Sequence, residues 1–354
     1  METIGVGIIG AGGIAQVHLQ TLSNMPEIQV LAVADVVPGR AKEVAERWGI
    51  PHAFEDYQEL LKLDEIQAVH VCTYNQAHRA PSVDALHAGK HVMVEKPLAA
   101  TLEDATDMVR AAKQTGKMLM CAVKSRYSAD VVAAKRIISE GTLGEIYYAE
   151  TVLDRRRGIP GGTFIRQASA GLGAVADLGV YSLDTALYLM GHPTPQTVSG
   201  ITTNVIGKTH QPPAIGWKWN PEELEVEEFG AAWIRFTNGA VLVFKTCWAM
   251  HMDTLGGTFF LGTKAGLRLT PEVRVFRDEW GYLVDVVPQG AKETEWRELF
   301  RLEIEDFYCA LREGRPSPID PVEVLLTNVI IDGVIRSARE GGREVPVAIP
   351  DLSV

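Results

Sequence analysis

Two glycines and an alanine near the start of the chain have the types and spacing that could hold a phosphate group. Gly10, Gly12 and Ala15 form a Gly-x-Gly-x-x-Ala pattern between an apolar run and a helical pattern. The first glycine permits a tight turn, the second lets a pyrophosphate approach the backbone, and the alanine allows close strand–helix packing. The free N–H groups where the helix opens, at Gly13 and Ile14, are expected to bind the phosphates. The pattern predicts a dinucleotide site, with a glycine-rich turn that binds no ligand as the alternative.

Asp35 ends the second apolar run and indicates which dinucleotide is bound. A carboxylate at this position accepts hydrogen bonds from the adenosine ribose hydroxyls and repels a 2′-phosphate, so NAD is favoured. Arg40 follows shortly afterwards and could instead pair with a 2′-phosphate. NADP therefore stays possible.

Polar residues follow two more apolar runs, at the points where the predicted strands end. Thr73, Asn75 and His78 follow one run, and the triplet Glu95-Lys96-Pro97 follows the next. Open α/β sheets bind their ligands at the carboxyl ends of parallel strands, so we expect these residues beside the cofactor. A lone loop histidine such as His78 more often has a structural role.

Residues 171–190 predict a single helix that begins with glycines. Within it Asp177, Tyr181 and Asp184 fall at i, i+4 and i+7, on one face of a helix otherwise rich in Ala, Leu and Val. Such a polar face is either solvated or lines a cleft, and the sequence leaves both readings open.

The elements that must position these residues alternate between strand and helix over roughly the first 120 residues. Strands are predicted at 4–9, 30–34, 68–73, 91–94 and 118–123, and helices at 14–22, 39–48, 81–88 and 103–115. The alternation predicts an α/β fold with a doubly wound parallel sheet of the Rossmann type over residues 1–124.

The pattern changes after Lys124. A helix is predicted at 130–140, and strands are predicted at 145–153, 198–205, 230–237, 240–247, 258–262 and 273–277. Residues 207–225 are predicted to form a long loop, and helices return at 299–313 and 322–340. We expect residues 125–354 to form a second α/β domain with an open, mostly antiparallel sheet and C-terminal helices near the domain interface.

The charge and composition of the chain limit the classes of molecule that it is expected to bind. The 354 residues carry a formal net charge of −11, which argues against nucleic acid or an anionic membrane as the main partner. The four cysteines are scattered, and no run reaches membrane-spanning length or resembles a secretion signal, so a cytoplasmic location is expected. No His, Cys, Asp or Glu spacing predicts a metal site, and Glu227-Glu228 is interpreted as a strand-edge acidic pair.

Taken together, these motifs resemble those of the glucose–fructose oxidoreductase / inositol dehydrogenase / rhizopine-catabolism (Gfo/Idh/MocA) family. The resemblance covers nearly the whole chain and depends on the order of the motifs. They are Gly10-Ala11-Gly12, Asp35, Asn75 with His78, Glu95-Lys96-Pro97, Gly141-x-x-Gly144-Glu145, residues 171–184 and Val226-Glu227-Glu228-Phe229. The resemblance implies NAD(P)-dependent oxidation or reduction at a hydroxyl of a sugar, cyclitol or related polyol. It also implies a homodimer or homotetramer that assembles through the sheet.

By matching position, the resemblance makes Lys96 the lysine beside nicotinamide and substrate, and Asp177 the substrate-side aspartate. Tyr181 stands where many relatives have an acid/base histidine, although glucose–fructose oxidoreductases and dihydrodiol dehydrogenases also have tyrosine there. An unperturbed phenol has a pKa of about 10, and a nearby ammonium would stabilise its phenolate. We therefore predict a Lys96–Tyr181 proton relay with Asp177 orienting the substrate, against a packed core aromatic as the alternative for Tyr181.

Secondary candidates surround this set. Lys124 and Arg126 follow the last strand of the first domain and are predicted to contact substrate. The run 155–157 is three arginines, which cannot all point one way, and one of them could reach an anion.

Trp217, Trp219 and Trp248 would suit sugar stacking, although tryptophans are more often core residues. His18 is interpreted as a surface or packing residue, and the loops at 153–170 and 207–225 are expected to set specificity.

Two other functions stay open. Some relatives are NAD-dependent glycosidases that oxidise their substrate only transiently, and these release an aglycone without a net change in the cofactor. A non-catalytic dinucleotide-binding regulator is the third reading. The intact Lys96 and Asp177 weigh against it, while Tyr181 in place of histidine supports it weakly.

Overall fold

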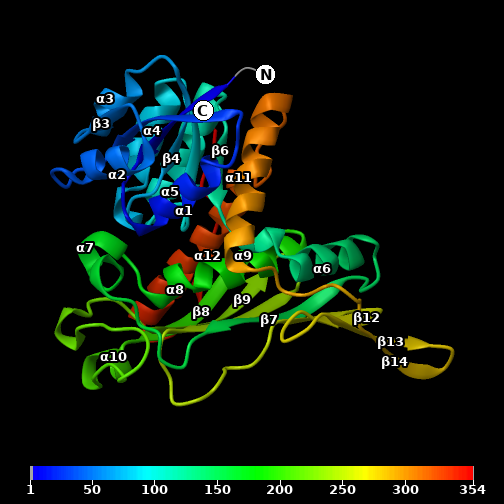
Figure 1. Cartoon of the computed structure of the whole chain (residues 1–354). Helices are drawn as coiled ribbons and strands as arrows, with labels where there is room; N and C mark the ends of the chain where they lie inside the picture. Colours follow the sequence, from blue (N-terminus) through cyan, green and yellow to red (C-terminus); the bar gives the residue numbers. More distant parts are fainter. Residues whose placement is uncertain (1–2, 354) are drawn as a thin grey trace. The chain divides into compact units, whose positions relative to one another are not determined.

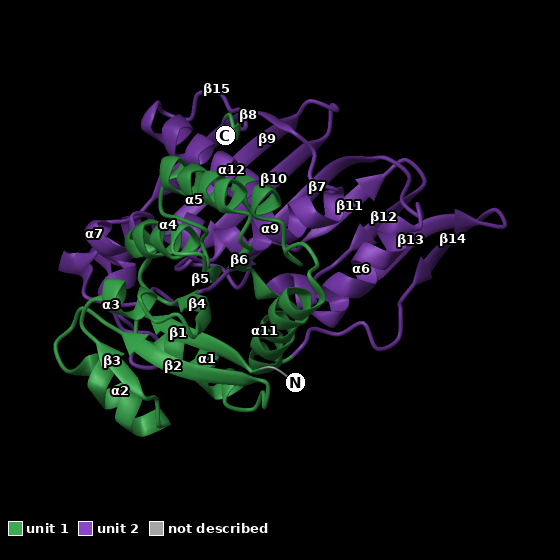
Figure 2. Cartoon of the chain, turned by 90° about the horizontal axis from the view of Figure 1, so that it is seen from above, with its two compact units in different colours: residues 1–124, 295–325, 351–354 green, residues 125–294, 326–350 purple. Residues whose placement is uncertain are grey.

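The chain forms two compact units, which Figure 2 colours separately. The computed structural model describes residues 3–353. Unit 1 comprises residues 1–124, 295–325 and 351–354, and unit 2 comprises residues 125–294 and 326–350. Residues 295–325 thus join unit 1, whereas the sequence interpretation assigned all of 125–354 to the second domain. The reason is α11 (Trp296–Glu313), whose buried Phe300 packs edge-on against His18 of α1.

Unit 1 contains a six-stranded parallel sheet in the order β3-β2-β1-β4-β5-β6. This order confirms the predicted doubly wound fold, in which β1 and β4 lie side by side at the topological switch point. The strands are β1 (Ile4–Ile9), β2 (Ile28–Ala34), β3 (His52–Phe54), β4 (Ile66–Val71), β5 (His91–Glu95) and β6 (Leu119–Ala122). The helices that follow them are α1 (Gly13–Leu22), α2 (Arg40–Trp48), α3 (Tyr57–Leu61), α4 (Arg79–His87) and α5 (Leu102–Thr115).

Unit 2 contains a nine-stranded sheet in the order β14-β13-β12-β11-β7-β10-β9-β8-β15. Its neighbours pair antiparallel except β7 and β10, which are parallel, so the predicted mostly antiparallel sheet is confirmed. The strands are β7 (Ile146–Asp154), β8 (Pro195–Thr203), β9 (Phe229–Phe236), β10 (Val241–Cys247), β11 (Phe259–Gly262), β12 (Ala265–Arg268), β13 (Arg274–Glu279), β14 (Tyr282–Val286) and β15 (Val345–Pro346).

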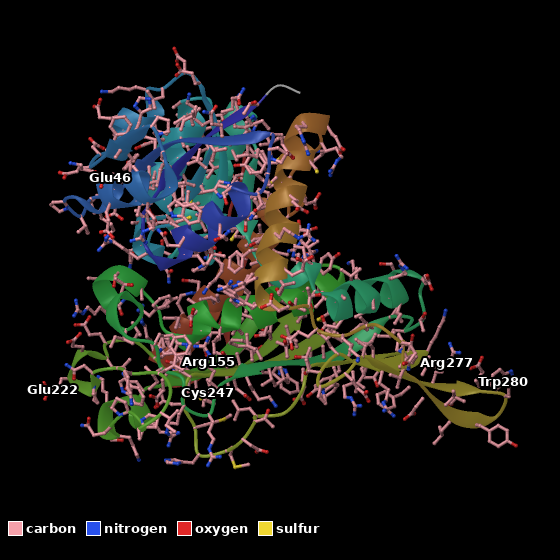
Figure 3. The ribbon with its side chains drawn as sticks, in the orientation of Figure 1. Glu46, Arg155, Glu222, Cys247, Arg277 and Trp280 are labelled. Carbon is pink, nitrogen blue, oxygen red and sulfur yellow. The ribbon has the colours of Figure 1, made fainter. Side chains whose placement is uncertain are left out.

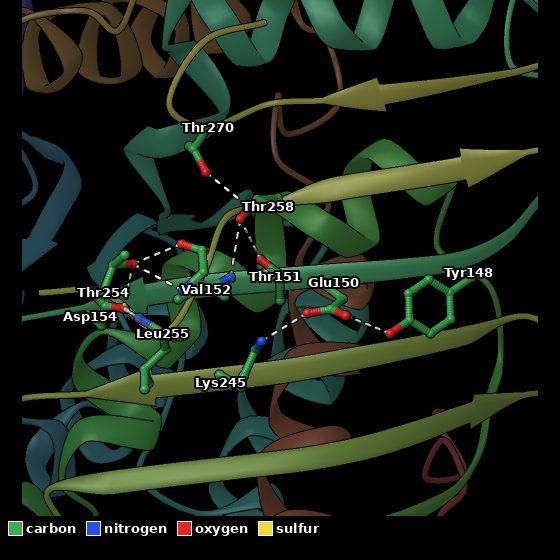
Figure 4. A network of polar contacts seen from close by, with 11 residues as sticks. Tyr148, Glu150, Thr151, Val152, Asp154, Lys245, Thr254, Leu255, Thr258 and Thr270 are labelled. Carbon is green, nitrogen blue, oxygen red and sulfur yellow. Dashed lines mark hydrogen bonds and ion pairs between the residues drawn. The ribbon is translucent and has the colours of Figure 1, made fainter. Parts of the chain in front are cut away.

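The two faces of this sheet differ. Ala149 and Thr151 of β7 and Phe244 of β10 are buried on the inner face, beneath α8 (Ala174–Asp177) and α9 (Gly179–Met190), while α6 (Ala129–Ser139) packs on α9 (Figure 1). On the outer face, Glu150 accepts hydrogen bonds from Tyr148 Oη at 2.7 Å and from Lys245 Nζ at 2.8 Å (Figure 4). These polar contacts join β7 to β10 in register.

A second set of contacts in Figure 4 fixes the end of β7 against the segment that leads into β11. Thr258 Oγ1 accepts the N–H of Val152 at 3.1 Å, and Thr270 Oγ1 accepts the N–H of Thr258 at 2.8 Å. Asp154 Oδ2 accepts the N–H of Leu255 at 2.6 Å. Beyond them, the β13–β14 hairpin carries Trp280 at its tip, 80% exposed (Figure 3).

The glycine-led segment at 171–190 is not the single helix that the sequence predicted. It divides into α8 and α9, which meet at Leu178, and α7 (Gln167–Ala170) precedes them. Before α8, Gly171 has a φ of 73°, and Gly173 lies so close to Glu227 that a Cβ there would be 1.8 Å from the Glu227 carbonyl oxygen. The break follows a backbone bond from Tyr181 N to the Leu178 carbonyl, one residue shorter than an α-helical bond.

The remaining elements complete the two units. The segment predicted as a loop over 207–225 contains the end of α10 (Val205–Thr209) and one short turn of 3₁₀ helix (Pro221–Glu223). The last helix, α12 (Pro321–Arg339), begins in unit 1 and continues in unit 2 after Leu325. Within residues 3–353, none of the helices combines the length and the apolar character that a bilayer crossing requires.

Candidate active site

The glycine loop of unit 1 has the form of a phosphate cradle. Gly10 adopts a φ of 91°, and a Cβ there would lie 2.7 Å from the carbonyl oxygen of Cys72, so only glycine fits. A Cβ at Gly12 or Gly13 would meet nothing within 4 Å, which shows open space on that side of the loop. No side chain caps the N-terminus of α1, and its first turn has no acidic residue. Uncapped N–H groups beside open space fit a bound pyrophosphate.

Asp35 is held in place at the end of β2. Its side chain is 8% exposed, Oδ2 accepts the N–H of Ala11 at 2.8 Å, and Oδ1 accepts the N–H of Val37 at 2.8 Å. The bond to Ala11 ties the carboxylate directly to the glycine loop. Arg40 Nη1 lies 3.5 Å from Oδ2, so the cation considered as a partner for a 2′-phosphate is paired with this carboxylate.

The loop after β4 is tied to the loop after β5 by His78. The imidazole is buried, with Nδ1 2.8 Å from the carbonyl oxygen of Pro97 and Nε2 3.3 Å from that of Thr73. Burial lowers the pKa of His78, so its neutral ring has one N–H, which the shorter contact assigns to Nδ1. Thr73 Oγ1 donates to the carbonyl of Ala77, and Asn75 begins the short helix of that loop. His78 therefore holds the backbone of the loop after β4 and the backbone of the loop after β5.

Glu95 is the buried end of β5 and precedes Lys96. Its Oε2 accepts the N–H of Lys96 at 3.2 Å, and Oε1 lies 3.0 Å from His18 Nε2. Burial opposes ionisation, but the hydrogen bond and charge of His18, with the charges of Lys124 and Lys96, lower the pKa of Glu95 to about 2. A buried carboxylate thus stands directly behind Lys96.

His18 lies in the interior of unit 1 rather than on its surface. Its ring is 1% exposed and makes polar contacts through both nitrogens, to Glu95 and to His70. The interpretation as a surface or packing residue missed this polar role. The available signal was that His18 shares its helix face with the buried Ala15, Leu19 and Leu22.

In unit 2, Asp177 is fixed at the end of α8. Its side chain is 8% exposed, and Oδ2 accepts a hydrogen bond from Nε1 of the fully buried Trp248 at 2.9 Å. The other end of α8 is held by Glu227, whose Oε1 accepts the N–H groups of Gly173 at 2.7 Å and Val175 at 3.1 Å. Sequence reasoning did not find these two positioning contacts.

Glu227 and Glu228 were interpreted from the sequence as a strand-edge acidic pair, and the structure shows that both bind backbone N–H groups of neighbouring segments. Both precede β9, and Glu228 is 2% exposed, with its carboxylate accepting the N–H groups of Ile206 at 2.6 Å and of Gly207. Burial raises the pKa of both glutamates, while the backbone N–H groups oppose that rise. The pair anchors α8 and α10.

Tyr181 and Asp184 lie on α9, and Asp184 has a partner of its own. Tyr181 is half-buried, whereas Asp184 is fully buried in a two-pronged ion pair with Arg126, whose Nε and Nη2 lie 2.8 Å from its oxygens. The guanidinium also lies 4.8 Å from the ring centre of Tyr188. Arg126 thus has a structural role in unit 2, and its contact with substrate stays a prediction.

The other candidates are distributed widely. Lys124, in unit 1, is buried with its ammonium 4.5 Å from the ring centre of Phe300. In unit 2, Arg155 lies 4.7 Å from the ring of the half-exposed Trp217, while Arg157 Nη2 contacts His251 Nδ1 at 3.1 Å.

Trp219 and Trp248 are core residues and are not available for sugar stacking; their cluster includes Ile159, Ile165, Ala174, Leu178, Leu224, Val226 and Ala249. No group of three or more metal-binding side chains is present in residues 3–353.

Comparison with known proteins identifies the family. Residues 4–123 match an oxidoreductase family with an NAD-binding Rossmann fold, and residues 131–268 match its C-terminal domain. A D-glucoside 3-dehydrogenase of Escherichia coli is 30% identical over 343 residues, which cover 96% of each chain. The chain belongs to the Gfo/Idh/MocA oxidoreductase family.

Other Gfo/Idh/MocA proteins agree with this assignment. A levoglucosan dehydrogenase of Pseudarthrobacter phenanthrenivorans is 28% identical over 397 residues, covering 100% of both chains. A solved structure of levoglucosan dehydrogenase in complex with NADH superposes with a TM-score of 0.83 at 23% identity, over 99% of this chain and 100% of that one. The match confirms the fold, and the chain is an oxidoreductase related to sugar dehydrogenases.

Proposed function

We propose that this oxidoreductase uses NAD to oxidise a secondary hydroxyl of a sugar or glycoside, or to catalyse the reverse reduction. The observation that carries the proposal is Asp177, an acidic side chain held at 2.9 Å by Trp248 in the C-terminal domain of the family. A carboxylate fixed in this way accepts a hydrogen bond from a substrate hydroxyl without reorganising. The relationship to the E. coli D-glucoside 3-dehydrogenase favours a pyranose ring over an open-chain polyol.

The bound cofactor supplies the hydride acceptor, and the residues of this chain supply the proton chemistry. The ammonium of Lys96 stabilises Tyr181 as a phenolate, which accepts the hydroxyl proton and becomes the neutral phenol as the carbonyl forms. Asp177 orients the hydroxyl. Glu95 and His78 fix the backbone on either side of Lys96, through the Lys96 N–H and the Pro97 carbonyl.

The preference for NAD rests on Asp35. Both of its oxygens are held by backbone N–H groups, of Ala11 and Val37, and still have lone pairs for ribose hydroxyls. The same carboxylate is expected to repel a 2′-phosphate, while Arg40 is already paired with it. These contacts support NAD over NADP as the cofactor.

The test is a reduction assay with NAD and NADP in parallel against D-glucosides, levoglucosan, aldoses, cyclitols and sugar acids. The proposal expects NADH formation with at least one pyranose substrate and a preference for NAD. Release of aglycone from a glycoside without net NADH would replace it with the glycosidase reading. Cofactor binding with no reaction across the panel would support a regulator.

We also propose that two copies of the chain associate through the outer face of the nine-stranded sheet. Several large apolar side chains are exposed on that face, among them Trp233 at 40%, Ile201 at 55% and Leu261 at 36%. Exposed apolar patches of this kind mark interfaces more often than solvated surface. Light scattering is expected to show a dimer or tetramer, and Trp233→Glu is expected to reduce the mass to that of a monomer.

A further inference from the structure

Six ionisable side chains lie in the interior of unit 1, and none is more than 5% exposed. Burying charged groups is unfavourable unless each is paired or neutralised. The cluster therefore needs an explanation beyond packing. Its members are His18 on α1, His70 on β4, Glu95 at the end of β5, Lys124 after β6, and Glu303 and Tyr308 on α11.

Four of these residues form a continuous row of hydrogen bonds. Glu95 Oε1 lies 3.0 Å from His18 Nε2, His18 Nδ1 lies 2.7 Å from His70 Nδ1, and His70 Nε2 lies 2.7 Å from Tyr308 Oη. The row ends at the carboxylate that accepts the N–H of Lys96. It connects the proposed reaction centre to α11, from a part of the sequence about 200 residues away.

The contact between the two imidazoles fixes how many protons the row holds. A nitrogen–nitrogen contact of 2.7 Å requires one ring to donate and the other to accept. Burial alone would lower the pKa of His18, but Cys72 and Glu95 raise it well above its usual value. Burial and the charge of His18 lower the pKa of His70. His18 is thus the cation, donating to Glu95 and to a neutral His70.

Glu303 is the member that no hydrogen bond satisfies. It is fully buried, and neither carboxyl oxygen has a partner among the described residues. Burial raises the pKa of Glu303 to about 8, the charge of Glu95 adds to the rise, and Lys124 and His18 oppose it. At neutral pH the group is a protonated acid beside two cations, and a small change in the local charge would ionise it.

We propose that Glu303 releases its proton when the oxidised nicotinamide binds near the end of β5, so that NAD⁺ binding is linked to proton release. The inference rests on the cofactor site of the proposed function. The oxidised ring carries a positive charge, and the reduced ring does not. The O–H bond of the carboxylic acid breaks, the electron pair stays on the carboxylate, and the proton passes to the buffer.

The sign of the linkage follows from the charges that face Glu303. His18 and Lys124 are cationic, Glu95 is anionic, and His70 and Tyr308 are neutral; burial raises the pKa of Tyr308 well above its usual value. A further positive charge favours the carboxylate, so NAD⁺ binds more tightly as pH rises towards about 8, the pKa of Glu303 in the free protein, and the affinity levels off above it. A shift of one pKa unit on binding corresponds to about a tenfold change in affinity. NADH is expected to show no such trend.

The test is calorimetric titration of the full-length protein with NAD⁺ and with NADH, in phosphate and in Tris, between pH 6.5 and 9. For a shift of one pKa unit, the wild-type chain is expected to release at most about half a proton per NAD⁺, near pH 7.5, and its dissociation constant is expected to fall about tenfold across the range. Glu303→Gln keeps the shape of the protonated acid and is expected to abolish both effects. Glu305→Gln, on the same helix and ion-paired with Arg301, is the matched control.

An infrared difference spectrum gives an independent measurement. Addition of NAD⁺ is expected to remove the carbonyl band of a protonated carboxyl in the wild-type chain, and not in Glu303→Gln. Equal proton release by the wild-type chain and Glu303→Gln would overturn the inference and leave the proposed function standing. If NAD⁺ does not bind the wild-type chain at all, the proposed function fails first.

Discussion

Trp248 donates a hydrogen bond from its indole Nε1 to Oδ2 of Asp177 across 2.9 Å, and both side chains are buried. Trp248 follows β10, and Asp177 ends α8. The sheet of unit 2 thus positions an acidic side chain of the helix layer that covers it. A tryptophan that could have been a sugar platform is instead the partner of the proposed substrate-orienting residue.

Trp248→Phe removes this donor and leaves the ring volume largely filled. Loss of a hydrogen bond to a charged group costs about 1.5–3 kcal/mol, so we expect kcat/KM to fall roughly 10- to 100-fold. Trp219→Phe is the control, because that buried indole donates to the carbonyl of Gly207 at 2.8 Å in the same apolar cluster. Steady-state kinetics in which both variants retain full kcat/KM would show that Asp177 does not depend on Trp248.

Tyr181→Phe removes the proposed proton acceptor and keeps the aromatic ring. General acid–base catalysis contributes about 10²- to 10⁴-fold, so kcat is expected to fall within that range while the NAD dissociation constant is unchanged. The pH profile of kcat should also lose its dependence on the phenol. Full turnover by the variant would transfer the proton role to Lys96 alone.

Asp35→Ser removes the carboxylate that we expect to select NAD. The KM for NAD is expected to rise about tenfold or more, and the ratio of activity with NADP to activity with NAD is expected to increase. Glu43→Gln is the control, since Glu43 is an exposed residue of α2 that pairs with Arg47. An unchanged cofactor ratio in Asp35→Ser would place the selectivity elsewhere.

Glu303→Gln is expected to stabilise the protein at alkaline pH, whether or not a cofactor is present. The pKa of Glu303 is raised by burial from 4.5 to about 8, so the folded state holds this proton more tightly than the unfolded state does. The resulting penalty is absent below about pH 4.5, grows as pH rises, and reaches at most about 5 kcal/mol above pH 8. Urea unfolding at pH 5 should show little difference between the two chains, and at pH 9 the variant should be more stable. A wild-type advantage at pH 9 would contradict the prediction.

Patterns that repeat along the sequence predicted most of unit 1. The apolar runs, the glycine loop and the position of Asp35 follow directly from local spacing. In the structure the runs form strands, the glycine loop follows β1, and Asp35 follows β2. The polar role of His18 could not be predicted from local spacing, because its hydrogen-bond partners are distant in the sequence. His70 lies on β4, and Glu303 and Tyr308 lie on α11.

Unit 2 was harder to predict for a similar reason. Gly173, just before α8, lies against the backbone of Glu227, a contact between residues 54 positions apart that local spacing does not reveal. The strands β12 and β14 are short. In β14 the neighbouring residues Tyr282 and Leu283 are both exposed, so the strand lacks the alternation of buried and exposed residues that would predict it. Both strands exist because neighbouring strands pair with them. Tertiary pairing overrides weak local preference at such positions.

Unit 1 is built from segments that lie far apart in the sequence, and this has a consequence for how the protein folds during synthesis. Strands β1 to β6 leave the ribosome early, but α11 emerges only after residues 125–294 have been synthesised. Until then, the face of α1 that bears His18 and Leu22 lacks its cover, and the histidine row lacks Tyr308. The nucleotide-binding unit therefore cannot complete its core during translation until α11 has been synthesised.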